Sequence, residues 1–422
     1  MRVLLVNKFH YRKGGSETYY FAVADALQEL DHEVHFFAME DEKNLPCEDS
    51  DLFVPNRDYN GPSSPLAKVS AALSIVYSRE SRRRFQELCE RVRPDVVHMN
   101  LVHRQITLSI LDAPYLREHH VPVVWTAHDY IGVCPSYTML DGDENVCDAC
   151  LDGHFSSCLK RKCVKRSTAK SGMAMLEAEF LKHSHAYNKI DRIICPSRFL
   201  AEKMVEGGFS KSQVVWMPNF ITNGSLEAME RVATPECNEP YFLYFGRLSA
   251  EKGVDVLISA FSEASLKLPD DWRLKIAGSG PAEESLRACA KDSAASCRIE
   301  FLGYKSGDEL ASLIKGARWS VVPSTWRENM PYSIVESLAA GTPVIGSEMG
   351  GIPELVRNGE TGYTFPVGDV SALSEALVRA SMVTEERIEC FKSNCRSFVR
   401  ARCSQEKYVF LLIDLYRSLN KE

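Results

Sequence analysis

Short apolar runs alternate with helical segments along the whole chain, and this alternation constrains the fold more than any other feature. The runs lie at residues 3–6, 34–38, 95–99, 121–126, 192–195 and 214–216, and again at 241–245, 274–277, 298–302, 319–322 and 344–345. Such runs are typical of strands buried on both faces, and parallel pairing of strands requires a crossover, usually a helix. The sequence therefore predicts an α/β protein with two successive parallel sheets, each covered by helices.

Composition excludes several classes of protein. The 422 residues are 45% hydrophobic and 25% charged, which suits two to three globular domains. The net charge of −7 gives no general attraction to nucleic acid, so nucleic acid is not expected as a partner. No apolar run approaches the roughly 20 residues that span a bilayer, and residues 1–10 lack a signal-peptide pattern. We therefore expect a cytoplasmic protein whose 14 cysteines are mostly thiols.

The stretch 321–351 contains an informative pair of acids. Its sequence, VVPSTWRENMPYSIVESLAAGTPVIGSEMGG, predicts a strand, a loop, a helix and a second strand. Pro331 suits the first helical position, and Gly341 suits the C-terminal cap. Glu328 is thereby expected at the helix N-terminus and Glu336 on the helix, in an E-x7-E spacing. A helix N-terminus can also bind a phosphate or a sugar hydroxyl.

A second motif, GRLSAEKG, follows the apolar run at 241–245. It places Arg247 and Lys252 five residues apart, after a predicted strand and before a predicted helix. Two cations in this position can clasp a diphosphate, because arginine offers a directional fork and lysine a point charge. The alternative is a surface ion pair with Glu251, which the position of the motif disfavours.

Two features of the first half also lie at predicted strand ends. Gly14 and Gly15 precede a helix that Ser16 can cap, and glycine lets a backbone approach a ligand closely. His128 follows the run at 121–126, and ligands of open α/β sheets bind at the carboxyl ends of the strands. An ordinary capped turn and a structural histidine are the plain alternatives, since neither feature is specific alone.

In combination, the E-x7-E spacing, the segments AAGTPVI and GGIPE after it, and GRLSAEKG resemble the retaining GT-B glycosyltransferases of the family 4 (group 1) type. A GGSE loop and a histidine in TAHD extend the resemblance into the first half. It implies two Rossmann-like domains whose parallel sheets face a central cleft. The implied boundaries are 1–218 for an acceptor-side domain, 219–403 for a nucleotide-sugar domain and 404–422 for a helix that crosses back to the first domain.

The resemblance also implies a reaction and roles for residues. Enzymes of this type move a sugar from a nucleotide diphosphate to an acceptor hydroxyl with retained anomeric configuration. Arg247 and Lys252 would neutralise charge on the leaving diphosphate. Glu328 would hold sugar hydroxyls, and His128 would orient the sugar. The other residues implied to bind the donor are Gly14, Gly15, Gly246, Gly278, Tyr304, Asn329, Met330, Pro331 and Glu336. This scheme requires no cofactor, because side chains supply the cations.

Several parts of the function stay open in the sequence. The segment 329–331 reads Asn-Met-Pro where the family commonly has G-x-G, so the donor could be UDP-, GDP- or ADP-linked. A saccharide or lipid-linked acceptor is expected, in the assembly of cell-surface polysaccharide or glycolipid. The arginine-rich segment 77–93 is either a solvated helix face or a peripheral contact with the inner face of the membrane. A catalytically silent nucleotide-sugar-binding or scaffold protein and a GT-B nucleotide-sugar epimerase are the alternative functions.

A cysteine-rich insertion at 134–163 departs from the family pattern. Cys147 and Cys150 have the spacing of a metal knuckle, and Cys158 with Cys163 supplies a second pair. These four thiols predict a structural zinc site that would hold together a loop without a core of its own. The alternate ligands are Cys134 and His154. An iron–sulfur cluster or unligated thiols would explain the same residues.

Overall fold

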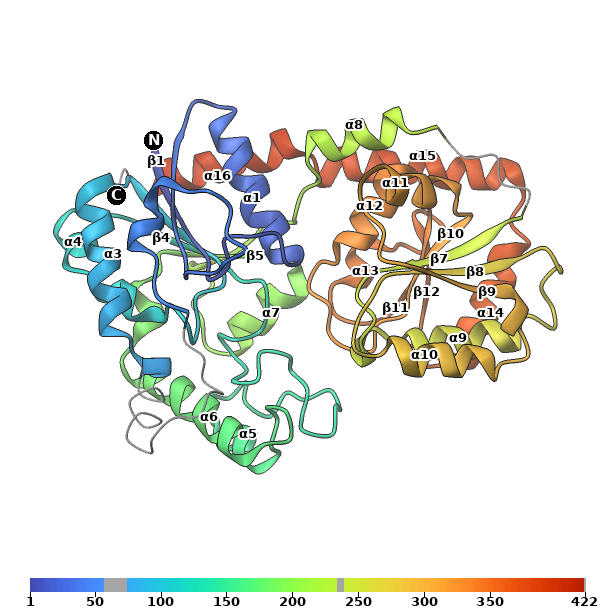
Figure 1. Ribbon diagram of the computed structural model, residues 1–422, viewed down its shortest axis with the longest axis horizontal. Coiled ribbons are helices and arrows are strands. Elements are labelled where there is room, and N and C mark those ends of the chain that lie inside the picture. The colour runs from blue at the N-terminus through green and yellow to red at the C-terminus, as the bar shows by residue number, and fades with distance from the viewer. Residues whose placement is uncertain (57–73, 234–238, 421–422) are drawn as a thin grey trace. The chain divides into compact units, whose positions relative to one another are not determined.

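The computed structural model of the protein describes residues 1–56, 74–233 and 239–420 (Figure 1). The last two positions of the predicted C-terminal helix are therefore outside the described residues. The chain divides into two compact units, here called the first and the second unit. The first unit consists of Met1–Met217 and Tyr408–Glu422, and the second of Pro218–Lys407. The predicted boundary followed residue 218, whereas the structure has it after Met217.

The first unit is built on a six-stranded parallel sheet with the order β2-β1-β3-β4-β5-β6. Its strands are β1 (Arg2–Val6), β2 (Glu33–Phe37), β3 (Val96–Met99), β4 (Val123–Thr126), β5 (Arg192–Cys195) and β6 (Val214–Trp216). Its α-helices are α1 (Gly15–Gln28), α3 (Arg79–Val92), α4 (Pro114–Glu118), α5 (Ser156–Lys160), α6 (Thr168–His183) and α7 (Arg198–Glu206). Short 3-10 helices lie at η1 (Glu48–Leu52), η2 (Leu108–Asp112) and η3 (Ala186–Lys189). Because all six strands are parallel, their carboxyl ends share one edge of the sheet.

The last helix, α16 (Gln405–Leu419), is bonded to the sheet of the first unit from Tyr408 onward. The hydroxyl of Tyr416 lies 2.6 Å from Nδ1 of His98, and Nε2 of the same ring lies 2.7 Å from Oγ1 of Thr126. Tyr19 contacts both Thr126, at 3.0 Å, and the hydroxyl of Tyr408, at 2.5 Å. Burial lowers the pKa of His98 to about 3, so the ring is neutral and bonds on both sides. This buried network fixes the C-terminal segment to strands β3 and β4.

Tyr416→Phe is expected to destabilise the protein by about 1–3 kcal/mol, the usual cost of leaving a buried polar group without its partner. The substitution removes the hydroxyl that contacts Nδ1 of His98. Chemical denaturation measures the change in the free energy of unfolding. Tyr304→Phe is the matched control, because Tyr304 is 74% exposed and should tolerate the loss of its hydroxyl. Equal stability of the two variants would contradict the role of the network.

The second unit is built on a six-stranded parallel sheet with the order β12-β11-β10-β7-β8-β9. Its strands are β7 (Tyr241–Phe245), β8 (Arg273–Ala277), β9 (Ile299–Gly303), β10 (Trp319–Val322), β11 (Val344–Ser347) and β12 (Gly362–Phe365). Its helical elements are α8 (Asn223–Arg231), η4 (Ala250–Lys252), α9 (Val254–Ala264), α10 (Glu283–Lys291), η5 (Ser296–Arg298), α11 (Gly307–Gly316), α12 (Tyr332–Ala340), α13 (Ile352–Leu355), α14 (Val370–Ser381) and α15 (Glu385–Arg402).

The central strands β7, β10 and β11 of this sheet are buried on both faces, which explains their apolar sequences. Phe242 of β7 packs in a core layer that contains residues of α9 and α14, whereas Leu243 packs in a second layer that contains residues of α12. This division follows the strand geometry, because successive side chains point to opposite faces. Figure 1 shows α9, α10 and α14 on one side of the sheet and α11 and α12 on the other. The polar side chains that could bind a ligand are therefore expected in the loops at the strand ends.

Candidate functional site

Two loops of the second unit bring Lys252 to Glu328 at the carboxyl edge of the sheet. Lys252 ends η4, which follows β7, and Glu328 lies between β10 and α12. The Lys252 ammonium is 2.5 Å from Oε1 of Glu328, and the Ser324 hydroxyl donates to the same oxygen at 2.8 Å. Glu328 is 5% exposed. Strands β7 and β10 are neighbours in the sheet, so two motifs far apart in the sequence form one charged site.

The Glu328 carboxyl is ionised despite its burial. Burial by itself raises its pKa, but the charge of Lys252 and hydrogen bonds from Lys252, Trp326 and Ser324 bring the pKa below the ordinary value. The ion pair in turn fixes the position of the Lys252 ammonium. Because an ammonium has three N–H donors, Lys252 can bind an anionic ligand while it stays paired with Glu328.

Two glycines make the close approach of these loops possible. Gly253 has φ +64°, and a Cβ atom there would lie 2.1 Å from the carbonyl oxygen of Pro323. Gly350 has φ +59°, and its Cβ would lie 2.2 Å from the carbonyl oxygen of Glu328. That carbonyl also accepts a hydrogen bond of 2.7 Å from the N–H of Gly351. A larger residue at either glycine would push the loop that carries Glu328 away from Lys252.

Arg247 is exposed in the segment that follows β7. Among the described residues, no acid pairs with its guanidinium. The Glu251 carboxylate, which was the alternative partner for both cations, instead accepts a hydrogen bond of 2.7 Å from the Ser249 hydroxyl. The surface ion pair considered for this motif is therefore absent from the described part of the chain, and Lys252 pairs with Glu328 instead.

Helix α12 carries Glu336 and begins one residue later than predicted. Pro331 is the residue before the helix, with an extended backbone, and Gly341 closes the helix with φ +88° as expected. Glu336 is partly exposed, yet the dense surroundings of its carboxyl raise its pKa to about 7 through desolvation. In the described residues its carboxyl has no hydrogen-bond or ion-pair partner. An unpaired carboxyl of this kind can accept hydrogen bonds from ligand hydroxyls.

The remaining residues implied to bind the donor follow adjacent strands or flank Glu328. Gly246, Gly278 and Tyr304 directly follow β7, β8 and β9, which are neighbours in the sheet. Tyr304 is exposed, as a side chain that stacks on a base would be. Asn329 directly follows Glu328. Met330 differs, because its side chain is buried and its sulfur accepts a hydrogen bond from the N–H of Asn219.

His128 of the first unit lies just beyond the end of β4, as predicted from its place after an apolar run. Its Nε2 is 2.9 Å from Oδ1 of Asn100, which follows β3 directly, and the ring packs edge-on against Tyr19. Burial lowers the pKa of His128 to about 3, so the imidazole is neutral. Since the amide oxygen accepts the Nε2 proton, Nδ1 is left as an acceptor for a ligand hydroxyl. The single N–H of the neutral ring is therefore used by Asn100, so that His128 can accept a hydrogen bond from a ligand but not donate one.

Gly14 lies directly before α1, and Gly15 is the first residue of that helix. This turn is supported by Glu17, the last residue of the GGSE motif, and by Asn7, which the sequence analysis did not single out. Asn7 is fully buried after β1; its amide donates to the carbonyl of Phe9 at 2.7 Å and to Oε1 of Glu17 at 3.2 Å. Glu17 lies in the first turn of α1. A usable signal existed, because Asn7 and Asn100 each stand directly after an apolar strand.

Two comparisons place this chain in a family. Residues 13–223, half of the chain, match the family described as Glycosyltransferase Family 4, and residues 227–394 match that described as Glycosyl transferases group 1. The chain belongs to glycosyltransferase family 4. The phosphatidyl-myo-inositol mannosyltransferase of Mycobacterium leprae is 33% identical over 40% of this chain and 44% of its own length. A putative colanic acid biosynthesis glycosyltransferase of Salmonella typhimurium is 29% identical over 38% of this chain and 40% of its own length.

These matches to the curated relatives span less than half of either relative's length. A solved structure extends the likeness of the family 4 chain over almost its whole length. Anabaena HepE in complex with UDP and glucose has a TM-score of 0.67 at 15% identity, over 99% of this chain and all of that one. A glycosyltransferase from Rickettsia africae has a TM-score of 0.68 at 16% identity. The GT-B fold implied by the motifs is thereby confirmed.

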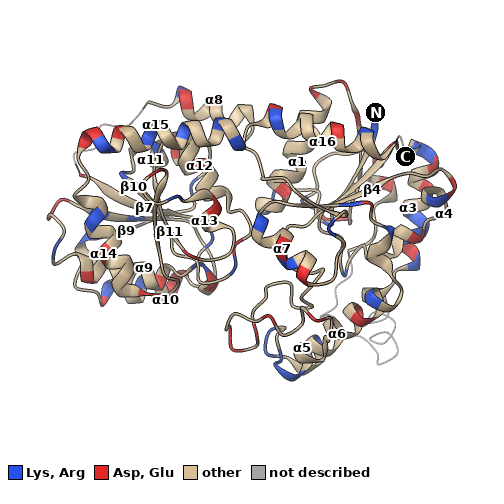
Figure 2. Cartoon of the chain, turned by 180° about the vertical axis from the view of Figure 1, so that it is seen from behind, with Lys and Arg blue, Asp and Glu red and all other residues tan. Residues whose placement is uncertain are grey.

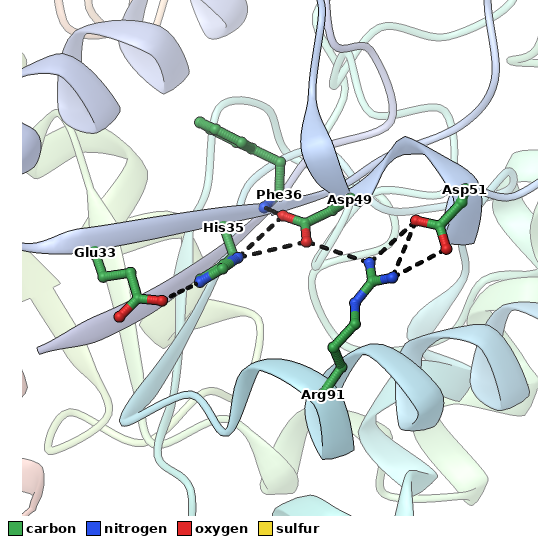
Figure 3. Close-up of polar contacts among 6 residues, drawn as sticks. All are labelled: Glu33, His35, Phe36, Asp49, Asp51 and Arg91. Atoms are coloured by element: carbon green, nitrogen blue, oxygen red, sulfur yellow. Dashed lines mark hydrogen bonds and ion pairs between the residues drawn. The ribbon is translucent and has the colours of Figure 1, made fainter.

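The arginine-rich segment 77–93 of the family 4 chain forms α3, and many of its arginines are paired. Arg91 binds Asp51 at 3.0 Å and Asp49 at 3.3 Å, and Asp49 also contacts His35 of β2 (Figure 3). Acidic side chains are interspersed with the basic ones along this helix (Figure 2). These ion pairs favour the solvated helix face over a membrane contact for α3. Across the described residues, no helix is both long and apolar enough to cross a membrane.

The cysteine-rich insertion of the family 4 chain lies between β4 and β5. Cys150 and Cys158 are buried, whereas Cys134, Cys147 and Cys163 are partly exposed, and all five are free thiols. His154 is exposed and contacts Asp152, so it is not placed as the alternate ligand that its position in the sequence suggested. Within the described part of the chain, no three His, Cys, Asp or Glu side chains already stand at the spacing of metal ligands.

Proposed function

We propose that this protein is a retaining glycosyltransferase that moves a sugar from a nucleotide-diphosphate donor to an acceptor hydroxyl. The observation that carries the proposal is the ion pair between Lys252 and the buried Glu328 at the carboxyl edge of the second sheet. The cation Arg247, which no described acid pairs with, lies in the same segment as Lys252. The Anabaena structure with UDP and glucose supports a nucleotide-sugar donor. UDP-, GDP- and ADP-linked sugars are the candidate donors. Family membership supports the transfer reaction.

Departure of the nucleoside diphosphate is the step that the cations serve. Negative charge grows on the leaving phosphate as the glycosidic bond breaks, and positioned cations stabilise that charge without reorganising. Lys252 is held in place by Glu328, whereas Arg247 is free to bind two phosphate oxygens with its planar fork. Glu328 uses its second oxygen for sugar hydroxyls, because Oε1 is already occupied by Lys252 and Ser324.

Glu336 and His128 have supporting roles in the proposal. Glu336 accepts hydrogen bonds from the ribose, which would give its unpaired carboxyl the partners that it lacks in the described residues. His128 accepts a sugar hydroxyl proton at Nδ1 and cannot act as a cation, because its pKa is about 3. With no protein nucleophile assigned, the departing phosphate deprotonates the acceptor hydroxyl on the same face of the sugar. That arrangement retains the anomeric configuration.

The acceptor is a saccharide or a lipid-linked saccharide in this proposal, and the pathway is assembly of cell-surface polysaccharide or glycolipid. The names of the mannosyltransferase and of the colanic acid glycosyltransferase support this class. Peripheral contact with a membrane would then come from the acceptor rather than from the paired arginines of α3.

A panel of UDP-, GDP- and ADP-sugars tests the function. Thermal stabilisation identifies the donor, and release of the nucleoside diphosphate in the presence of glycolipid or oligosaccharide acceptors reports transfer. Nuclear magnetic resonance of the product gives the anomeric configuration, and inversion would contradict the retaining mechanism. A silent binder would be stabilised without releasing nucleotide. An epimerase would convert the donor sugar without any acceptor.

His128→Ala is expected to lower turnover by about a hundredfold, or roughly 3 kcal/mol, while the affinity for nucleoside diphosphate changes little. The reason is that the contacts proposed for Arg247, Lys252 and Glu336 with the nucleotide are in the second unit, whereas His128 is in the first. Calorimetry gives the affinity, and nucleotide release gives turnover. His183→Ala, at an exposed position, is the control. A collapse of nucleotide affinity with normal turnover at saturation would make His128 a nucleotide ligand.

A further inference from the structure

Five cysteines of the insertion surround one small cavity in the first unit. The cavity has a volume of about 10 Å³, and its lining includes Cys134, Cys147, Cys150, Cys158 and Cys163. It contains little room for water, and a cavity lined by thiols offers a water molecule poor partners. Thiolate sulfur, in contrast, is the preferred ligand of zinc in structural sites.

Local backbone contacts explain how the cysteines come together. Residues 139–147 form a tight hairpin, with a bridge between Leu140 and Val146 and a bond of 2.9 Å from the N–H of Cys147 to the carbonyl of Met139. The tip of this hairpin lies against the end of α5, where the N–H of Gly142 donates to the carbonyl of Arg161. These contacts place the hairpin beside the segment that carries Cys158 and Cys163.

Four of the five sulfurs form the closer group. Cys158 and Cys163 interact as a hydrogen-bonded pair, and the sulfurs of Cys134 and Cys150 are near enough to interact electrostatically with both and with each other. The thiol of Cys147 interacts electrostatically with Cys150 but is not among the main electrostatic partners of Cys134 or Cys158, and it accepts a hydrogen bond of 3.4 Å from the Arg161 guanidinium. The sequence spacing had favoured Cys147 over Cys134, because a C-x-x-C pair is visible in a sequence and a spatial neighbour is not.

We propose that Cys134, Cys150, Cys158 and Cys163 bind one structural zinc ion. The thiols are not yet at ligand spacing, so the ion would draw the sulfurs together by rotation of their side chains. Cys147 is the fifth, non-ligating thiol in this assignment.

Two further observations fit a zinc–thiolate centre at this place. The separate apolar cluster at the insertion is very small, with Cys150, Phe155, Cys158 and, from α6, Ala174 as its buried members. A segment that buries so little apolar surface needs a cross-link, such as a bound metal ion, to be ordered. In addition, residues 153–176 contain six lysines and arginines and no aspartate or glutamate. A zinc ion with four thiolates is net negative, so this basic run would stabilise it.

The zinc ion would also connect the insertion to the candidate active site. Cys134 lies in the turn after β4, where its N–H donates to the carbonyl of Tyr130 at 2.8 Å. His128 stands at the start of the same loop. If Cys134 is a zinc ligand, the metal therefore restrains the loop after β4 that contains His128. A site that used Cys147 instead of Cys134 would have no ligand in that loop.

Elemental analysis of the full-length protein, purified without added metal, tests the proposal. We expect about one zinc per chain in the wild type and in Cys147→Ser, and a loss of zinc in Cys134→Ser. Cys390→Ser, at an exposed thiol on α15, is the matched control. Loss of zinc in Cys147→Ser with retention in Cys134→Ser would overturn the ligand set. Iron in place of zinc would overturn the identity of the metal.

A second measurement does not depend on the folding of a variant. Replacement of the metal by cobalt in the wild type should give the strong charge-transfer absorption of a tetrahedral thiolate site. Four thiols should resist a thiol reagent while the metal is bound. Addition of a chelator should then raise the number of thiols per chain that react quickly. The proposal would be overturned if all five cysteines of the insertion reacted at the same rate with and without chelator. It would also be overturned if mass spectrometry found disulfides among them.

Discussion

Arg247→Ala and Lys252→Ala are each expected to lower kcat/KM for sugar transfer by about a hundredfold. Removal of one well-placed charge from the site of a developing anion costs roughly 3 kcal/mol. The two variants should differ in stability. Arg247 is exposed and no described acid pairs with it, so its loss should leave the free energy of unfolding unchanged. The loss of Lys252 leaves Glu328 buried without its counter-charge and should destabilise the protein as well.

The matched control for this pair is Arg400→Ala, an exposed arginine on the outer helix α15. Nucleotide release measures transfer, and chemical denaturation measures stability. Turnover near the wild-type value in both active-site variants would refute the proposed diphosphate site. A destabilised Arg247→Ala would show instead that the guanidinium has a structural partner.

Glu336→Gln is expected to stabilise the protein at pH 8 and to weaken donor binding at the same time. In the folded state the pKa of Glu336 is raised to about 7 by desolvation, from an ordinary value of 4.5. The ionised carboxylate is therefore disfavoured by folding, and the stability that the protonated form provides is lost as the pH rises from the unfolded pKa to the folded one. A shift of this size corresponds to about 3 kcal/mol at most, because each pKa unit is worth about 1.4 kcal/mol.

The sign of this effect makes the experiment sharp. At pH 4, below the unfolded pKa of 4.5, the carboxyl is mostly protonated in both the folded and the unfolded state, so glutamine and glutamate should be almost equally stable. At pH 8 the glutamine variant should be more stable, and denaturation at the two pH values measures the difference. Donor binding serves as the functional readout, since the wild type should prefer a ribonucleotide over its 2′,3′-dideoxy analogue and Glu336→Gln should not. An unchanged preference would remove Glu336 from the ribose site.

The fold was predictable because its central strands are buried on both faces. Residues 241–245 read as a continuous apolar run, and the structure shows why, with Phe242 and Leu243 packed in layers on opposite faces of the sheet. The predicted end of α12 agrees with the structure, since Gly341 caps this helix with a left-handed backbone. The start of α12 was one residue off, because proline is suited both to the first turn and to the residue just before it.

The contacts of the candidate site were harder to predict. The motif containing Lys252 suggested Glu251 as a partner, whereas the neighbouring strands β7 and β10 bring in Glu328 from a distant part of the sequence. Local spacing gives no information on such pairs. The same reason applies to Cys134, whose place beside the other cysteines depends on folding of the insertion, and to Asn100, which determines the proton position on His128.

The return of the chain to the first unit at Tyr408 has a consequence for engineering. The first unit is not one uninterrupted stretch of the chain, because it needs both residues 1–217 and the C-terminal segment that bonds to His98 and Tyr19. A chimera that exchanges the second unit with that of a relative should therefore replace only residues 218–407. A fusion made at residue 218 alone would pair the first sheet with a foreign C-terminal helix, whose tyrosines would have to match by chance.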